Sequence, residues 1–188
     1  MKVLLTGSTG YIGKRILPEL VDQGHHVVCC VRDRRRFSAP ASLAPSIELI
    51  ELDLLDEKSL EQIPQDIDAA YYLVHSMSSS TDYQELEARS ATNFKNALAK
   101  TRAKQVIYLS GMINEKELSP HLASRKRVEE ILGEGNYHLT TLRAGIIIGS
   151  GSASFEIIRD LAEKLPVMIT PRWLNTRCQP IGMHDVKN

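Results

Sequence analysis

The sequence predicts an α/β protein with a doubly wound, mostly parallel sheet and helices on both faces. Apolar strand-like runs alternate with helical patterns along nearly the whole chain, which is typical of parallel strands joined by right-handed crossovers. The first strand passes into the first helix through three glycines, Gly7, Gly10 and Gly13. A length of 188 residues with 43% hydrophobic content fits one domain with a single sizeable core. Ligands of such a sheet bind at the carboxyl ends of its strands.

Each element has its own signal. Strands are expected at Lys2–Leu5, His26–Val31, Ile47–Leu52, Ala69–Val74, Gln105–Leu109 and Leu139–Arg143. Helices are expected between them at about Tyr11–Gln23, Glu57–Gln62, Asp82–Lys100, Pro120–Leu132 and Phe155–Leu165. Asp82 with Glu85 predicts a capping box, and Ser119 followed by Pro120 predicts an N-cap with proline at the first helical position. Pro18 predicts a kink in the first helix.

The turn after the first strand predicts a dinucleotide site. Its sequence is Thr6-Gly7-Ser8-Thr9-Gly10-Tyr11-Ile12-Gly13. Glycines at this spacing allow a tight turn, a close approach of the backbone to phosphates, and close packing of the helix on the strand. Backbone N–H groups and the positive end of the helix dipole then converge where a pyrophosphate can bind. A phosphate-loop NTPase motif is excluded, because Ser8 stands where its glycine is required and Lys14 is followed by Arg15.

The end of the second strand bears on the choice between NADP and NAD. An NAD site places a carboxylate there for the ribose 2′-hydroxyl, whereas an NADP site supplies a cation for the 2′-phosphate. Here Arg32 ends the strand and is followed by Asp33 and by Arg34 to Arg36. A planar guanidinium binds a phosphate bidentately, so Arg32 favours NADP over NAD. For Arg34 to Arg36 an alternative stays open, in which they begin a solvated helix capped by Asp33.

Two further strand ends add candidates for the cofactor cleft. Asp53 follows the third strand and either accepts a hydrogen bond from the adenine amino group or is a simple turn acid. Leu54 lies beside it, and Val74 and His75 follow the fourth strand. We group all four with the cofactor-binding residues, and expect His75 to line the cleft as a neighbour rather than as a participant.

Composition and charge exclude several classes of partner. The formal net charge is zero and the pI is about 7.0, so no global field draws the chain to nucleic acid or to anionic lipid. No stretch approaches the ~18 apolar residues of a membrane span, and no apolar signal segment is seen, so we expect a cytoplasmic protein. Cys29, Cys30 and Cys178 match neither a disulfide framework nor a metal site. The expected partner is a small molecule.

A family resemblance rests on five segments: Thr6 to Gly13, Val31 to Asp33, Leu52 to Asp56, Leu109 to Gly111, and Leu142 to Gly149. Together they resemble the atypical short-chain dehydrogenases/reductases, above all the NmrA-like and nucleoside-diphosphate-sugar-epimerase-like proteins. The resemblance implies a Rossmann domain over residues 1–188, with NAD(P) across the strand ends, and then a smaller C-terminal substrate domain. Residues 179–186 resemble the place where family members enter their later helices, so we expect the chain to stop short of that second domain.

The resemblance also implies a catalytic pair that this sequence lacks. Active members use a tyrosine as general acid/base and a lysine four residues later, which lowers the tyrosine pKa and holds the ribose. None of the six tyrosines here has a lysine at that spacing. By alignment His121 takes the place of the tyrosine and Arg125 that of the lysine. Ser110 either matches the substrate-orienting serine or is a plain strand-end residue.

Two functions of different class follow. The first is an NADP(H)-dependent oxidoreductase or epimerase-like enzyme acting on a carbonyl compound or a sugar nucleotide, with Ser110 and His121 at the reacting oxygen and Arg125 on the ribose. His121 falls in a first helical turn, where the dipole disfavours its cation, so it is either a neutral donor or merely an exposed residue. The second is a binding protein without turnover that reports redox state to a partner. We favour the enzyme because the cleft is intact. Both a monomer and a homodimer stay open.

Overall fold

The computed structural model describes residues 1–75, 82–112, 118–164 and 179–187. The chain divides into two compact units, Met1–Leu142 and Arg143–Asn188, which we describe separately. Cys178 lies outside the described residues. No helix within the described ranges has the length and apolar character needed to cross a bilayer.

The first unit is built on a six-stranded sheet. Its strands are β1 (Lys2–Leu5), β2 (His26–Val31), β3 (Ile47–Glu51), β4 (Ala69–Tyr72), β5 (Gln105–Gly111) and β6 (His138–Ala144). Their order in the sheet is β3-β2-β1-β4-β5-β6, and the pairs β1–β2, β1–β4, β2–β3 and β4–β5 are parallel. The predicted doubly wound α/β class is confirmed. The strand order reverses between β1 and β4, and a sheet of this kind binds its ligands at the carboxyl ends beside that point.

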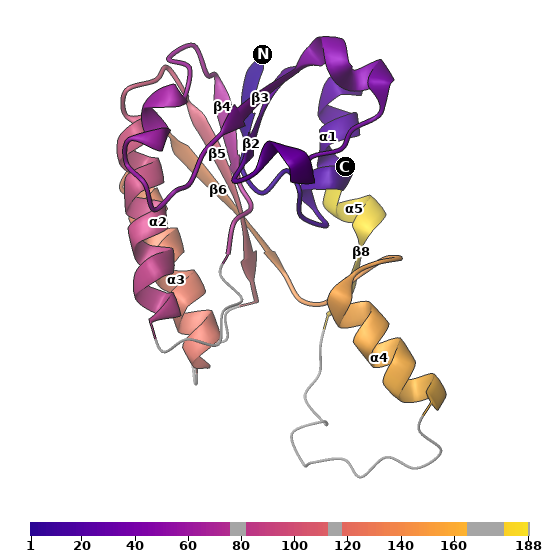
Figure 1. Ribbon diagram of the computed structural model, residues 1–188. Coiled ribbons are helices and arrows are strands. Elements are labelled where there is room, and N and C mark those ends of the chain that lie inside the picture. Colours follow the sequence, from indigo (N-terminus) through magenta and orange to yellow (C-terminus); the bar gives the residue numbers. More distant parts are fainter. Residues whose placement is uncertain (76–81, 113–117, 165–178, 188) are drawn as a thin grey trace. The chain divides into compact units, whose positions relative to one another are not determined.

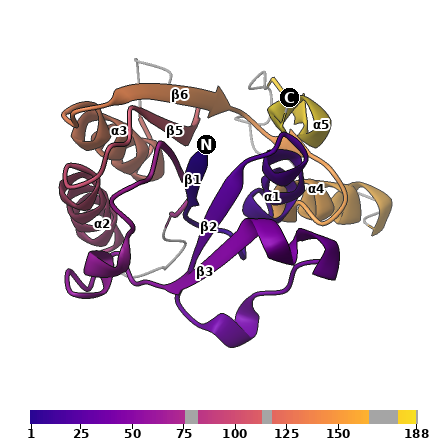
Figure 2. The same ribbon diagram turned by 90° about the horizontal axis from the view of Figure 1, so that it is seen from above.

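Helices cover both faces of this sheet. α1 (Gly13–Asp22) packs on one face, and α2 (Tyr83–Leu98) and α3 (Pro120–Gly133) lie side by side on the other (Figures 1 and 2). Alternate residues of β1 serve the two cores, because Leu4 packs in the cluster under α2 and α3 while Val3 and Leu5 pack in the cluster under α1. The long apolar runs predicted as strands are therefore buried from both sides.

Local signals in the sequence were right at some ends and wrong at others. Ser119 caps α3, since its hydroxyl accepts from the N–H of Leu122 at 3.3 Å. The predicted capping box at Asp82 is wrong, because that side chain makes no capping hydrogen bond to α2. The predicted helix at Glu57–Gln62 is also wrong, since the structure has only a short 3₁₀ turn, η3 (Ser59–Gln62). Two more 3₁₀ turns, η1 (Arg34–Arg36) and η2 (Ala41–Ser46), lie between β2 and β3.

The second unit is small. Strands β7 (Ile147–Ile148) and β8 (Ile181–Gly182) pair in parallel, and helices α4 (Ala153–Lys164) and α5 (Met183–Lys187) follow them. Only α4 was predicted. A two-residue strand is too short to give a periodic signal in a sequence, which explains why β7 and β8 were missed.

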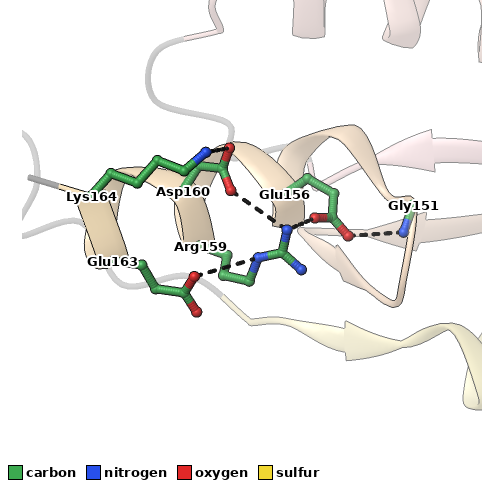
Figure 3. A network of polar contacts seen from close by, with 6 residues as sticks. All are labelled: Gly151, Glu156, Arg159, Asp160, Glu163 and Lys164. Atoms are coloured by element: carbon green, nitrogen blue, oxygen red, sulfur yellow. Dashed lines mark hydrogen bonds and ion pairs between the residues drawn. The ribbon is translucent and has the colours of Figure 1, made fainter.

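Helix α4 carries its charges on one side (Figure 3). The guanidinium of Arg159 pairs with three acids, Glu156, Asp160 and Glu163. Lys164 adds a pair at 2.7 Å to Asp160, and the N–H of Gly151 donates to the Glu156 carboxylate at 3.0 Å. The apolar side chains that lie between these charged residues in the sequence, Ile157, Ile158 and Leu161, are exposed. The helix is amphipathic, and its acids and bases are matched within it.

Candidate functional site

The glycine-rich turn after β1 has room for glycine only. Gly7 has a φ of +68°, and a Cβ there would lie 2.8 Å from the carbonyl oxygen of Leu73, just beyond β4. A Cβ on Gly13 would overlap the carbonyl oxygen of Gly7 and lie 2.8 Å from the Cα of Ser8. Real Cβ atoms do not come this close to backbone atoms. The turn therefore packs the start of α1 directly on the end of β1 and against the chain leaving β4.

The same turn presents backbone donors. The N–H of Gly10 donates to Gly7 at 2.9 Å, which closes the turn, and the N–H of Lys14 donates to Gly10 at 3.1 Å. The N–H groups of Thr9, Tyr11 and Ile12 have no acceptor among the described residues. Unpaired amides at a helix N-terminus suit a phosphate, because the donors and the dipole both favour an anion. The turn thus fits the pyrophosphate of a dinucleotide.

Two hydroxyls of the turn hold it to the sheet. The Thr6 side chain donates to the carbonyl of Tyr71 at 2.9 Å and accepts from the N–H of Leu73 at 3.1 Å, so it joins β1 to β4. The buried Ser8 hydroxyl donates to the carbonyl of Cys30 in β2 at 2.9 Å. Ser8 was predicted as a cofactor contact, and its hydroxyl is used inside the fold instead, which leaves its backbone for that role.

Arg32 and Asp33 differ in their partners. Each carboxylate oxygen of Asp33 accepts a hydrogen bond from the Arg35 guanidinium at 3.0 Å. The carboxylate also accepts from the backbone N–H of Arg35, so Asp33 is the N-cap of η1. The side-chain hydrogen bond from Arg35 lowers the pKa of Asp33. The Nε of Arg34 lies 3.8 Å from the Oε2 of Glu51, which makes an exposed ion pair. Arg32 is exposed and makes no ion pair among the described residues. The interpretation of Arg34 to Arg36 as a capped helical start is confirmed. Arg32 and Arg36 both lack an ion pair among the described residues, and Arg32 is the one that directly follows β2.

Asp53 and Leu54 form a turn after β3. One carboxylate oxygen of Asp53 accepts from the N–H of Leu55 at 2.9 Å, as a turn acid does. The carbonyl of the buried Leu54 accepts from the side-chain amide of Asn93 in α2 at 2.9 Å. These bonds fix the turn beside the end of β3.

A second group of polar side chains lies at the carboxyl ends of β4 and β5. Ser110 is 3% exposed, and its hydroxyl makes no hydrogen bond of good geometry among the described residues, although it lies close enough to the Tyr108 hydroxyl to oppose the burial that raises the pKa of that phenol. Arg125 of α3 donates through Nη1 to the carbonyl of Leu109 in β5 at 3.1 Å, while its buried Nε has no partner in the described part of the chain. Buried polar atoms are nearly always satisfied in proteins, so two exceptions at one strand end make it a candidate binding site, although the buried hydroxyls of Tyr11 and Tyr137 are exceptions elsewhere in the described residues.

Electrostatics place the two histidines beside Arg125. Desolvation of its ring, and then the positive charges of Arg125 and His121, lower the pKa of His75 against the opposing charge of Glu87, although the residue as a whole is exposed to solvent. His121 is exposed in the first turn of α3. The hydroxyl of Tyr108 donates to the Arg125 carbonyl at 3.3 Å and holds α3 to β5. The charges of Arg125 and His121 thus reach His75, while no hydrogen bond or ion pair joins these three side chains in the described part of the chain.

Comparison with known families agrees with this geometry. Residues 7–163 match the model of the family described as NAD(P)H-binding. The chain belongs to this NAD(P)H-binding family. It is 27% identical over 154 residues to the photosystem II assembly factor Ycf39 of Synechocystis, covering 79% of this chain and 46% of that protein. It is 24% identical to the chloroplastic divinyl chlorophyllide a 8-vinyl-reductase of Arabidopsis thaliana, covering 99% of this chain and 48% of that one. The chain spans less than half the length of these relatives.

Solved structures confirm the fold of this NAD(P)H-binding domain. The Bordetella bronchiseptica enzyme WbmH, in complex with NAD⁺, aligns with a TM-score of 0.77 at 19% identity, over 99% of this chain and 69% of that one. A UDP-glucuronic acid 4-epimerase variant from Bacillus cereus, in complex with a fluorinated UDP-glucuronic acid and NAD, aligns with a TM-score of 0.71 at 22% identity, over 100% and 71%. The fold that the resemblance to the atypical short-chain dehydrogenases/reductases implied is confirmed.

The sequence analysis missed one feature of this NAD(P)H-binding domain. Glu87 of α2 is 5% exposed and accepts a hydrogen bond from the hydroxyl of Ser124 in α3. A signal for it was present, because Glu87 occupies the same helical stripe as the buried Ala91, Phe94 and Leu98. An acid in an apolar stripe predicts a buried charge.

Proposed function

We propose that this protein binds NADP(H) in preference to NAD(H) and acts as an oxidoreductase or an epimerase-like enzyme on a small molecule. The observation that carries the catalytic part is the pair of buried, unpartnered atoms at the end of β5, the hydroxyl of Ser110 and the Nε of Arg125. A protein that only bound a dinucleotide would need the glycine turn but would have no use for unsatisfied polar groups two strands away.

The preference for NADP rests on the two residues that follow β2. Asp33 is engaged by Arg35, so its carboxylate is not free to accept from a ribose 2′-hydroxyl. Arg32 has no competing acid among the described residues, and a guanidinium matches a phosphate in shape and charge. Arg32 would therefore hold the 2′-phosphate, and the amides of Thr9, Tyr11 and Ile12 would hold the pyrophosphate.

The chemical roles follow from the strand ends of β4 and β5. A bound nicotinamide supplies or accepts the hydride, and the protein orients the reactants and handles the proton. The Ser110 hydroxyl would donate to the reacting oxygen, and Arg125, which cannot lose its proton, would bind the ribose. His121 would be a neutral donor near that oxygen. A carbonyl compound or a sugar nucleotide suits this set, as in the UDP-sugar complex of the epimerase named above.

Fluorescence titration with NADPH and NADH tests the cofactor choice. Arg32→Ala should weaken NADPH binding by roughly 10- to 100-fold, since a hydrogen bond to a charged group contributes about 1.5–3 kcal/mol, and should leave NADH binding unchanged. Arg34→Ala is the matched control, because its guanidinium faces Glu51 and its removal leaves the Asp33–Arg35 pair intact. Equal affinity of the wild type for both nucleotides would contradict the NADP preference.

Turnover is tested with carbonyl compounds by NADPH consumption, and with sugar nucleotides by product analysis. Ser110→Ala and Arg125→Ala should each lower turnover strongly, and His121→Ala should lower it less, because the residue is exposed. Tight NADPH binding with no turnover on either substrate class would point to the redox-reporting alternative.

A further inference from the structure

Two cations stand in the first turn of α1, where the helix dipole disfavours them. The turn reads Gly13-Lys14-Arg15-Ile16. Because the amino end of a helix carries a partial positive charge, a cation there lowers stability unless an anion is nearby. Lys14 is exposed, whereas Arg15 is partly buried. The partial burial of Arg15 at this end of the helix directs attention to what its guanidinium contacts.

The Arg15 guanidinium contacts Tyr11 in the glycine-rich turn at two points. Its Cζ lies 3.8 Å from the centroid of the Tyr11 ring, which is a cation–π contact. Its Nη1 donates to the Tyr11 carbonyl at 3.2 Å. A planar guanidinium suits this double contact better than the compact ammonium of a lysine. Arg15 therefore holds both the side chain and the main chain of Tyr11.

The Tyr11 carbonyl and the Ile12 N–H belong to one peptide group. That group is planar, and no peptide bond of the described residues is cis, so the carbonyl and the N–H point in opposite directions. A donor that fixes the carbonyl therefore fixes the direction of the N–H. A cationic donor also polarises the group, which strengthens the N–H as a donor. Like those of Thr9 and Tyr11, the Ile12 N–H has no acceptor in the described part of the chain.

We propose that Arg15 is a positioning residue of the cofactor turn: its guanidinium, stacked on Tyr11 and bonded to the Tyr11 carbonyl, directs and polarises the Ile12 amide toward the pyrophosphate. The inference rests on the proposed function in that this turn is assigned to the pyrophosphate of the nucleotide. Arg15 acts through the peptide group that joins Tyr11 to Ile12. Its neighbour Lys14 carries the same charge and does not share this role.

The first test follows the Ile12 amide by NMR in the protein without cofactor. Arg15→Met should shift the amide nitrogen and proton resonances of Ile12, because its peptide group loses the donor on its carbonyl. The resonances of Thr9 should shift less. Lys14→Met is the matched control, since it removes one positive charge from the same turn and leaves both contacts to Tyr11 in place.

The control should leave the Ile12 resonances nearly in place. Equal shifts of Ile12 in Arg15→Met and Lys14→Met would overturn the proposal. A lower Tm of Arg15→Met with unchanged Ile12 resonances would also overturn it, because Arg15 would then only stabilise α1.

The second test is affinity, measured by fluorescence titration with NADPH and with NADH. Arg15→Met should weaken the binding of both by roughly tenfold, since a misdirected amide loses much of a hydrogen bond to a charged phosphate and both nucleotides contain the pyrophosphate. Lys14→Met should weaken binding by less than about threefold, because salt screens an exposed charge. Equal losses in the two variants would show that charge alone acts, which would overturn the proposal.

Arg15→Lys separates charge from geometry. It keeps the positive charge and loses the planar group, so it should show most of the affinity loss of Arg15→Met. The same variant provides the test if Arg15→Met does not fold. Full wild-type affinity in Arg15→Lys would overturn the proposal.

Failure of this proposal is distinguishable from failure of the proposed function. If the wild type binds neither nucleotide, the assignment of the turn to a pyrophosphate is wrong, and the proposal falls with it. Arg32→Ala should weaken NADPH alone, so a wrong NADP preference leaves the result for Arg15 standing. Wild-type affinity for both nucleotides in Arg15→Met would overturn the role of Arg15 and leave the turn as the cofactor site.

Discussion

The two ends of the central sheet treat their polar groups in opposite ways. At the amino ends of the strands, Lys2 pairs with Glu48 at 3.2 Å and with Asp66 at 3.1 Å, and its backbone N–H donates to Asp68 at 2.7 Å. Arg102 completes the group by pairing with Asp68 at 3.0 Å. These charges satisfy one another, so their contribution is to the stability of the fold.

At the carboxyl ends some polar groups, such as Thr6, Ser8 and Asp53, are bonded within the fold, but others stay unsatisfied. The hydroxyl of Ser110, the Nε of Arg125 and the amides of Thr9, Tyr11 and Ile12 have no partner among the described residues. A buried group without a partner costs about 1–3 kcal/mol, and the fold tolerates this cost for Ser110 and Arg125 at the carboxyl ends as well as for the hydroxyl of Tyr137, which precedes β6. What distinguishes the carboxyl ends is that a hydroxyl, a guanidinium nitrogen and backbone donors without partners gather there, which favours them as the end that serves a ligand.

The largest test of this contrast is Gly13→Ala. The new methyl group would overlap the Gly7 carbonyl oxygen and push α1 away from the turn. Several hydrogen bonds to a charged phosphate, about 1.5–3 kcal/mol each, would be lost, so NADPH affinity should fall by more than about 100-fold. Fluorescence titration measures the change.

Gly24→Ala is the control for that variant. Gly24 has a φ of +77° with nothing within 4 Å of its added Cβ, and it lies beyond the other end of α1. The positive φ should lower stability by about 1–2 kcal/mol. NADPH affinity should be unchanged. Equal loss of affinity in both variants would mean that α1 as a whole, and not the fit at Gly13, determines binding.

Ser110→Ala separates stability from activity. The wild-type hydroxyl is buried without a partner, so its removal should leave the Tm equal or slightly higher. Turnover should fall by about 100-fold, the cost typical of losing one donor to a reacting oxygen. A clear drop in Tm would show that the hydroxyl is satisfied within the fold, which would remove the argument for a reserved donor.

Ser8→Ala gives the reverse pattern. Its hydroxyl is committed to the carbonyl of Cys30, so the variant should lose about 1 kcal/mol of unfolding free energy while NADPH affinity changes little. Chemical denaturation and fluorescence titration measure the two effects. A large loss of affinity at unchanged stability would assign the hydroxyl to the cofactor, as the sequence analysis predicted.

The fold was predictable because its signals are local. The strand runs, the three glycines and the N-cap at Ser119 each depend on neighbours in the sequence. The wrong predictions concern segments whose residues are compatible with both a helix and a turn. Glu57–Gln62 has helical composition, but Asp56 accepts from the N–H of Lys58 and favours a turn.

The site was only partly predictable, because partners come from distant elements. Arg32 and Ser110 were proposed as site residues because they stand at predicted strand ends, which the sequence shows. The bond from Ser8 to Cys30 spans 22 residues and could not be read from the glycine motif. Glu87 and Ser124 meet only because α2 packs on α3, and they are 37 residues apart in the chain. Burial of an acid is decided by that packing.

The smallest effect is expected for a change at Asp68, which directly precedes β4 at the amino ends of the strands, and this effect depends on pH. The backbone N–H of Lys2, and then the charge of Arg102, lower the pKa of Asp68 below its usual value. Asp68 therefore contributes its full stability above its unfolded pKa of about 3.9, and this contribution disappears as the pH falls through the lower folded value.

Asp68→Asn should lower the Tm slightly at neutral pH, by less than Ser8→Ala, because water screens a partly exposed pair. The difference from the wild type should vanish in acid, where both side chains are uncharged. A Tm difference that stays constant from neutral pH to about pH 2 would mean that Asp68 acts through its shape and not its charge.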